Sequence, residues 1–198
     1  MKTNLEQLVV LPKHGDEQFH ACNDDLGFSI KDFWSWNTSD LVSNVTRGHL
    51  AEFIVARALG AAEGVRNEWA TYDLITSNGT KVEVKSTAYL QSWSQDNYST
   101  IQFNVEPTKE LDLKNGGYRG TPKRHADVYV FALLAHKDKQ TVDPLNVKQW
   151  DFYVLPTSVL DKRTRSQHSI TLKTLVDLTG GSVDYFHLAD KIKSTKMT

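Results

Sequence analysis

A nearly unbroken apolar run at residues 127–134 (DVYVFALL) limits the folds open to this sequence. Alternate side chains of a strand point to opposite faces of a sheet, so a strand that is apolar almost throughout must be covered on both sides. Further strand-like runs stand at 71–76, 81–88, 100–105 and 149–155. Helical segments precede and follow these runs, and this order predicts an α/β layer structure built on a mixed sheet.

The main helical pattern lies before the first strand-like run. Ser39 is a suitable N-cap, Gly48 is a candidate interruption, and residues 47–59 (RGHLAEFIVARAL) carry an apolar stripe that includes Phe53. Gly60 stands where a glycine commonly ends a helix. After the strands, short helical or turn pieces are expected at 158–161, 172–178 and 185–192.

The length of the chain favours one structural unit. A chain of 198 residues can bury a core of its own, whereas two domains would each be small. We therefore expect a single domain over residues 1–198, with an N-terminal extension at 1–38, a core at 39–155 and helical or turn segments at 156–198. Phe33, Trp34 and Trp36 of the extension are expected to pack on the core.

Composition excludes several classes of protein. With 39% hydrophobic and 24% charged residues, the chain is typical of folded soluble proteins and not of disordered or fibrous ones. No apolar run approaches the roughly 20 residues that span a bilayer, and the first residues lack the pattern of a secretory signal, so we expect a cytoplasmic protein without membrane contact. The lone Cys22 cannot form an internal disulfide, and a net charge of −1 requires any nucleic-acid site to be a local basic patch.

Two acids and a lysine occupy neighbouring strand-like runs in a pattern that folding alone does not require: Asp73 in the first run, and Glu83 and Lys85 in the second. Hydrolysis of a phosphodiester needs charge neutralisation and an activated water, both of which Mg²⁺ supplies when one or two carboxylates hold it. Asp73 and Glu83 are candidate metal ligands, and the Val84 carbonyl is a further one. Lys85 lies on the same strand face as Glu83 and is a candidate to orient or deprotonate water. Two carboxylates on one face without a metal are expected to raise a pKa.

The turn between the two runs decides whether this site exists. If Asn78-Gly79 were a two-residue turn, Asp73 would pair with Val84 and point away from Glu83. If Ser77-Asn78-Gly79 is a three-residue loop with Gly79 left-handed, Thr76 pairs with Thr80 and Asp73 faces Glu83. The second register also places Tyr72 and Leu74 beside Val82 and Val84 on the core face. Apolar burial and assembly of the site therefore predict the same turn.

This pattern resembles the PD-(D/E)XK nuclease superfamily, whose signature is an acid on one strand, Glu-x-Lys on the next and a preceding helix that carries another Glu. Asp73 matches the first acid, Glu83 and Lys85 match Glu-x-Lys, and Glu52 matches the acid of the helix, which makes Glu52 a further candidate ligand. Tyr72 replaces the proline that often precedes the first acid. The resemblance implies a restriction endonuclease-like mixed β-sheet of four or five strands flanked by helices, Mg²⁺ or Mn²⁺, and cleavage of DNA or occasionally RNA. The segments WSWNTSDLVSN and QWDFYVLPTSVL are also similar to a bacterial group of proteins, which supplies no named substrate.

Residues 106–125 hold glycines, prolines and basic side chains, and they are predicted to form a long loop. Such a loop can close over the phosphates of nucleic acid, and its candidate contacts are Lys109, Lys114, Arg119, Lys123 and Arg124. A solvated loop without a ligand is the competing interpretation. Asp127, at the start of the buried strand, is expected to pair with Arg124.

Functions of different kinds remain open. The first is a metal-dependent nuclease that hydrolyses phosphodiester bonds, with DNA preferred over RNA and endonuclease over exonuclease action; a homodimer is compatible with it. The alternative is a catalytically silent module that binds nucleic acid or supports an assembly while it retains the nuclease fold. A third, hydrolysis of another phosphate ester, has no glycine-rich nucleotide loop to support it. Retention of Lys85 together with both acids favours the first.

Overall fold

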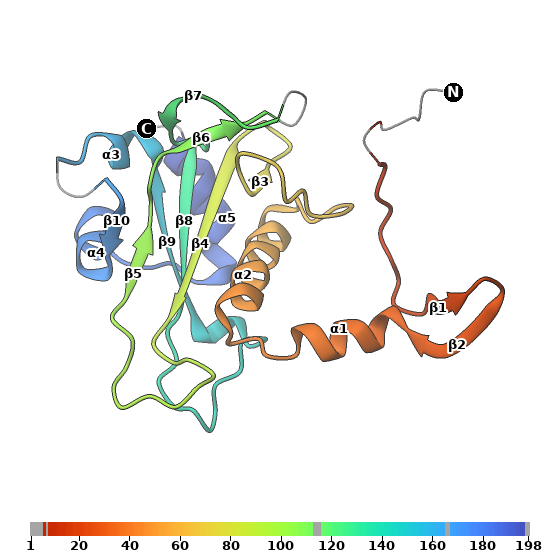
Figure 1. Ribbon diagram of the computed structural model, residues 1–198. Helices are drawn as coiled ribbons and strands as arrows, with labels where there is room; N and C mark the ends of the chain where they lie inside the picture. The colour runs from red at the N-terminus through yellow and green to blue at the C-terminus, as the bar shows by residue number, and fades with distance from the viewer. Residues whose placement is uncertain (1–5, 7, 113–115, 165–166, 197–198) are drawn as a thin grey trace. The chain divides into compact units, whose positions relative to one another are not determined.

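The apolar run at 127–134 forms the middle of a four-stranded mixed sheet in the computed structural model (Figure 1). Strand β8 (Val128–Leu134) is buried at every position, as its sequence requires. It pairs in parallel with β4 (Lys81–Ala88) and antiparallel with β9 (Trp150–Pro156). The short strand β3 (Leu74–Ile75) pairs antiparallel with the start of β4, so the order is β3-β4-β8-β9. The predicted α/β class with a mixed sheet of four or five strands is confirmed.

One face of the sheet is covered by two long helices, α2 (Asn44–Leu59) and α5 (Tyr185–Lys196). Side chains at alternate strand positions meet these helices, because the period of a strand is two. Full burial of each large apolar side chain in such a core contributes about 1.5–3 kcal/mol. The first core contains Ala51, Ile54, Val55, Val82, Val84, Val128, Val130, Phe152, Leu188 and Ile192 among others.

The opposite face is covered by smaller elements. These are α3 (Thr157–Asp161), α4 (Leu172–Thr179) and a two-stranded antiparallel sheet of β5 (Gln102–Asn104) and β10 (Ser169–Thr171). The second core between them contains Phe103, Tyr129, Phe131, Tyr153, Leu160, Ile170 and Leu175. A one-turn 3₁₀ helix, η1 (Val147–Gln149), leads into β9. The central strand is therefore covered on both faces, as predicted.

Helix α2 differs at its start from the sequence prediction and agrees at its end. It begins after Ser43 and runs through Gly48 without interruption. Ser39, the predicted N-cap, instead ends another helix, α1 (Ile30–Thr38). Gly60 ends α2 with a φ of 65° and donates its N–H to helix carbonyls, which is the predicted glycine cap. Phe53 lies exposed and outside the apolar stripe, contrary to prediction.

The structure describes residues 6, 8–112, 116–164 and 167–196, and the chain divides into two compact units. The first comprises 1–39 with 63–67, and the second comprises 40–62 with 68–198. The first unit contains α1 and a hairpin of β1 (Gln18–Ala21) and β2 (Asp24–Ser29), elements that the sequence analysis did not predict. Its aromatic residues Phe33, Trp34 and Trp36 lie on α1, where Trp36 is 83% exposed, and their predicted packing on the core stays a prediction. The single-domain organisation stays a prediction.

The predicted loop at 106–125 is instead a hairpin. Strands β6 (Thr108–Leu111) and β7 (Tyr118–Lys123) pair antiparallel, and β7 is exposed at every position. Strands without a buried face carry no alternation of apolar and polar residues, which is why the sequence suggested a loop. None of the helices within the described residues is long and apolar enough to cross a membrane.

Candidate active site at the edge of strand β4

The turn between β3 and β4 has the predicted three-residue form. The Thr76 N–H donates to the Thr80 carbonyl at 2.9 Å, which encloses Ser77, Asn78 and Gly79. Gly79 has a φ of 79°, a region that β-branched residues rarely adopt. The strands pair Leu74 with Val82, so the two-residue alternative is excluded. Leu74 packs on the first core, as this register requires.

Asp73 lies just before β3 and points at the neighbouring strand. Its N–H donates to the Val82 carbonyl at 3.1 Å, and its carboxylate Oδ2 accepts the Val84 N–H at 2.7 Å. A strand residue directs its N–H and its carbonyl to the same side. The Val84 carbonyl, predicted as a metal ligand, therefore belongs to the edge of β4 that Asp73 faces.

Tyr72 does not follow the predicted pattern. It was expected beside Leu74 on the first core, but it packs against the second core. The Lys81 ammonium lies over its ring, 5.1 Å from the centroid. Strand β3 begins only at Leu74, so Tyr72 lies outside it. The alternation of side chains between the two faces of a strand therefore does not decide which core Tyr72 contacts.

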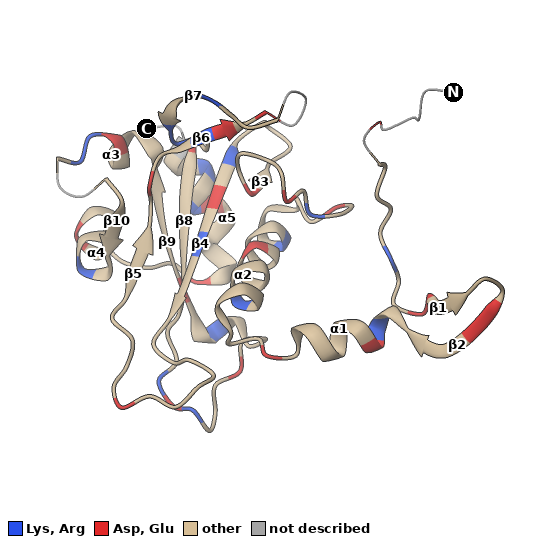
Figure 2. Cartoon of the chain, in the orientation of Figure 1, with Lys and Arg blue, Asp and Glu red and all other residues tan. Residues whose placement is uncertain are grey.

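Glu83 and Lys85 form an ion pair on β4, with Lys85 Nζ 2.6 Å from Glu83 Oε1. Their side chains are 17% and 33% exposed, so the pair is largely shielded from water. The register with β8 sets them beside Tyr129 and Phe131, on the side of the second core. Figure 2 shows acidic and basic bands alternating along β4.

Asp73 is held in an acidic environment. Burial, together with the nearby charges of Glu83 and Glu52, raises the pKa of its carboxyl from the ordinary value of 3.8 to about 7. The Val84 N–H and the Lys85 ammonium act in the opposite direction. Glu52 comes from helix α2, so residues of the helix and of both strands influence one another here. Burial contributes most to this raised pKa, and the neighbouring carboxylates act in the same direction, which is the direction expected from the sequence.

The chemistry of these residues fits a hard divalent cation. Mg²⁺ takes oxygen ligands and is usually held by one or two carboxylates with several retained waters. Asp73 and Glu83 provide two carboxylates, and a cation between them would compensate both the burial of Asp73 and its repulsion by Glu83, which together raise the pKa of Asp73. Within the described residues, no group of three or more His, Cys, Asp or Glu side chains is arranged to hold a metal. The fit is therefore to a two-carboxylate site and not to a cage made entirely of protein.

Two hollows flank Glu83. The first has a volume of about 240 Å³ and is lined by Asp73 and Glu83 and by residues of the β6–β7 hairpin, including Lys109 and Tyr118. The second has a volume of about 160 Å³ and contains Glu83, Lys85 and His125 in its wall. Asp73, Glu83 and Lys85 thus all border open space. Three residues of these walls were missed by the sequence analysis, which gave no signal for them: Trp69, Thr108 and Tyr118.

The basic residues predicted to contact phosphate lie in different surroundings. Lys109 lines the first hollow. Arg119 is exposed and pairs with Glu110 at 2.9 Å and Asp112 at 3.9 Å. Lys123 is exposed on β7, and Lys114 lies outside the described residues. Of these candidates, Lys109 is the one that the hairpin brings to the wall of the site.

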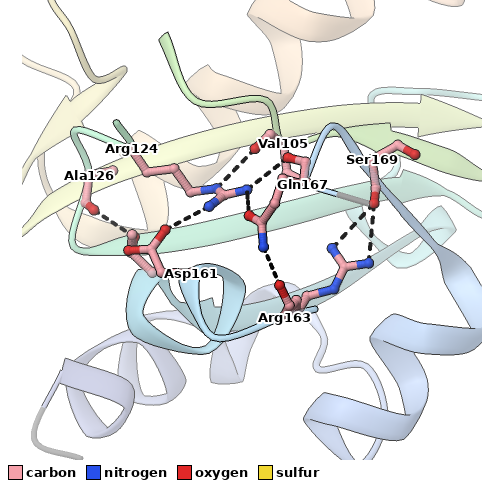
Figure 3. A network of polar contacts seen from close by, with 8 residues as sticks. Val105, Arg124, Ala126, Asp161, Arg163, Gln167 and Ser169 are labelled. Atoms are coloured by element: carbon pink, nitrogen blue, oxygen red, sulfur yellow. Dashed lines mark hydrogen bonds and ion pairs between the residues drawn. The ribbon is translucent and has the colours of Figure 1, made fainter. Parts of the chain in front are cut away.

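The phosphate-binding prediction requires Arg124 to lie on an exposed loop. The structure instead places it in the interior. Its guanidinium is buried and donates to the Val105 carbonyl at 2.9 Å, to Asp161 Oδ1 at 2.6 Å and to Gln167, as Figure 3 shows. The predicted pair with Asp127 is also wrong, since that carboxylate accepts the Lys81 N–H at 3.0 Å. Arg124 therefore joins the ends of β5, α3 and the segment before β10, and its guanidinium is not open to a phosphate.

The sequence matches the family model of bacteriophage T4 endonuclease IV over residues 6–174. Among solved structures, that of a bacterial homing endonuclease, I-Ssp6803I, is similar with a TM-score of 0.41 and 19% sequence identity. That match covers 79% of this chain and 99% of the other. No curated protein matches the sequence.

Proposed function

Because the chain belongs to the bacteriophage T4 endonuclease IV family, we propose that it is a metal-dependent nuclease that cuts phosphodiester bonds in DNA, as an endonuclease. Asp73, Glu83 and Lys85 form its catalytic centre, and Glu52 supports it from helix α2. The cofactor is Mg²⁺ or Mn²⁺. The arrangement supports the PD-(D/E)XK pattern, with an acid on one strand, Glu-x-Lys on its neighbour and a glutamate on the preceding helix.

One observation carries the proposal: Asp73 and Glu83 face each other across paired strands, in a partly buried place that raises the pKa of Asp73 to about 7. Like charges are held together there at a cost in stability. Perturbed carboxyl groups of this kind, beside open hollows, are characteristic of functional sites. A bound divalent cation would remove that cost and would explain why the carboxylates are held together.

The residues have two different roles, since some would bind the metal ion and Lys85 would act on the attacking water. Asp73, Glu83 and the Val84 carbonyl would hold the metal, which would supply neutralisation of the phosphate charge and a more acidic water. Lys85 contacts Oε1 of Glu83, so the other oxygen of that carboxylate would be open to the cation. This pair holds the Lys85 side chain beside the proposed metal ligands, where the ammonium would orient the attacking water or the neutral amine would deprotonate it. Glu52 adds negative charge that favours retention of the cation.

A cleavage assay tests the proposal. Linear, circular and single-stranded DNA, and RNA, are incubated with the protein in Mg²⁺, in Mn²⁺ and in chelator, with Lys85→Ala as the matched variant. Cleavage of circular DNA that requires the metal and is lost in Lys85→Ala is the expected result. Cleavage that continues in chelator contradicts metal dependence, and equal turnover by Lys85→Ala removes the lysine from the mechanism. Nucleic-acid binding without cleavage under every condition would favour the catalytically silent module.

A further inference from the structure

The first hollow has walls from two segments that are far apart in the sequence. Trp69 and Tyr72 stand on the segment that leads to Asp73, and Lys109 and Tyr118 stand on the β6–β7 hairpin. At about 240 Å³ it has room for about eight water molecules of about 30 Å³ each, or for one planar aromatic ring system. Asp73 and Glu83 are among the residues that line it, so whatever binds there is adjacent to the proposed metal site.

The pairing of the hairpin explains which side chains reach this hollow. Leu111 pairs with Tyr118 and therefore shares a face with it, and both line the hollow. Thr108 and Lys109, beside an irregularity in the pairing before Glu110, line the hollow as well. The neighbouring pair, Glu110 with Arg119, belongs to the face opposite Leu111 and forms an ion pair at 2.9 Å. The hairpin thus contributes Leu111 and Tyr118 from one face, together with two residues at the irregularity.

Two exposed aromatic side chains line the first hollow. Trp69 is 61% exposed and Tyr118 is 73% exposed. Single exposed aromatic residues are ordinary on a protein surface, but these two line one hollow that also contains the candidate catalytic carboxylates. Aromatic side chains beside a basic residue are the usual means of holding an unstacked base of a nucleic-acid strand.

The charges of the hollow select the part of a nucleotide that enters it. Asp73 and Glu83 are assigned to the proposed metal, and Glu68 is a further acid in the wall, so a phosphate beside Glu68 is repelled, whereas a neutral base is not. Lys109 is the basic side chain among the lining residues, and it stands on the hairpin strand. This distribution favours a base inside and a phosphate near Lys109.

We propose that the first hollow is a nucleobase-binding subsite, in which Trp69 and Tyr118 stack on one base of the strand being cut while Lys109 contacts its phosphate. This subsite rests on the proposed nuclease function and adds positioning residues to it. It holds the strand so that a neighbouring phosphodiester lies beside Asp73 and Glu83. The β6–β7 hairpin is then a substrate-binding arm.

Short DNA oligonucleotides with one 2-aminopurine, moved along the strand, test the subsite by fluorescence. Binding is measured in chelator, so that cleavage does not consume the probe and the result is independent of nuclease activity. One position of the probe is expected to be quenched on binding, because 2-aminopurine loses fluorescence when it stacks on an aromatic ring. Trp69→Ala and Tyr118→Ala should each weaken binding about tenfold and remove the quenching, whereas Tyr118→Phe keeps both. Trp93→Ala is the matched control, since Trp93 is a similarly exposed tryptophan outside this hollow.

An abasic nucleotide at the quenched position completes a double-mutant cycle. For the parent protein, loss of the base should weaken binding about tenfold; for Trp69→Ala/Tyr118→Ala it should change nothing, because the stacking partners are already gone. Equal losses in both proteins, or quenching that persists in the double variant, would overturn the proposal. Free 2-aminopurine nucleotide that binds as tightly as the oligonucleotide would also overturn it, since the site would then recognise a nucleotide and not a strand.

Discussion

Two groups of partly buried charge lie in the second unit of this protein, one around Asp73 and the other around Arg124. In the group around Arg124, the guanidinium donates to two backbone carbonyls, to a carboxylate and to an amide oxygen. In the group around Asp73, three acids influence one another, and the carboxyl of Asp73 has a pKa raised to about 7. The first group is fully paired within the chain, and the second carries an excess of negative charge.

The difference separates a structural role from a functional one. A buried guanidinium whose three nitrogens all donate within the chain is not open to a ligand, and it stabilises the joining of distant segments. A cluster of like charges is retained in spite of its cost when something outside the chain completes it. Substitutions in the two groups should therefore affect different properties.

The largest difference in cleavage rate between the two groups is expected when one carboxylate of each group is neutralised. Glu83→Gln removes the charge of a proposed metal ligand and should lower metal-dependent cleavage roughly 10³-fold, the equivalent of about 4 kcal/mol in the barrier. Asp161→Asn should leave the rate per folded molecule unchanged, because Asp161 contacts Arg124. Single-turnover cleavage measures both. Similar rates for the two variants would remove the functional distinction between the groups.

Loss of Arg124 should act on folding alone. Arg124→Met leaves the Val105 carbonyl and the Gln167 oxygens without their donor, and it should lower the free energy of unfolding by about 3 kcal/mol. Urea unfolding measures the loss. Cleavage by the fraction that remains folded should match the parent, and a normal stability with weak DNA binding would instead restore the phosphate role of Arg124.

The pH dependence of stability should show the charge conflict at Asp73. The folded state holds a proton on this carboxyl between its ordinary pKa of 3.8 and about 7, whereas the unfolded state releases it. Stability from this group therefore falls as pH rises through that window and stays low above it. Asp73→Asn removes the conflict, so in metal-free buffer it should be about 2 kcal/mol more stable than the parent at pH 8 and close to it at pH 3.5.

Denaturant unfolding at the two pH values, with and without Mg²⁺, measures this. Added Mg²⁺ should stabilise the parent at pH 8 and leave Asp73→Asn nearly unaffected. A difference between the two proteins that is the same at both pH values would mean that the carboxyl of Asp73 is not perturbed.

The smallest expected effect concerns the turn that brings Asp73 opposite Glu83. Gly79 has a positive φ and open space around its Cβ position, so Gly79→Ala should lower stability by about 1 kcal/mol through backbone strain alone. Gly48→Ala is the matched control, because Gly48 lies inside helix α2 with open space around it, where alanine stabilises by about 0.5–1 kcal/mol. Equal effects of both substitutions would contradict the three-residue turn.

The candidate site could be predicted because its geometry is local. Side chains of a strand alternate between its two faces, and this alternation together with the apolar residues around Leu74 and Val82 fixes the register of β3 against β4. The residues that decide it span about ten positions of sequence. The same reasoning identified β8, because a continuous apolar run permits few alternatives. The sheet and the relation between Asp73, Glu83 and Lys85 follow from these two patterns.

The surroundings of the site could not be predicted, because they depend on contacts between distant segments. The partners of Arg124 lie 37 and 43 residues away, and its place in a basic run suggested a surface role. The strands of the β6–β7 hairpin have almost no buried side chains, so their sequence lacks a strand pattern. The aromatic residues of α1 suggested burial from composition, although they are exposed in the first unit.

A calorimetric titration with Mg²⁺ or Mn²⁺ at pH 8 tests most directly the claim that the acidic group around Asp73 is a metal site. The parent protein and Asp161→Asn should bind one ion with the same affinity, because the group around Arg124 takes no part. Asp73→Asn/Glu83→Gln should show no binding at that site, since both carboxylates are gone. Identical metal affinity in the parent and in the double variant would contradict the assignment.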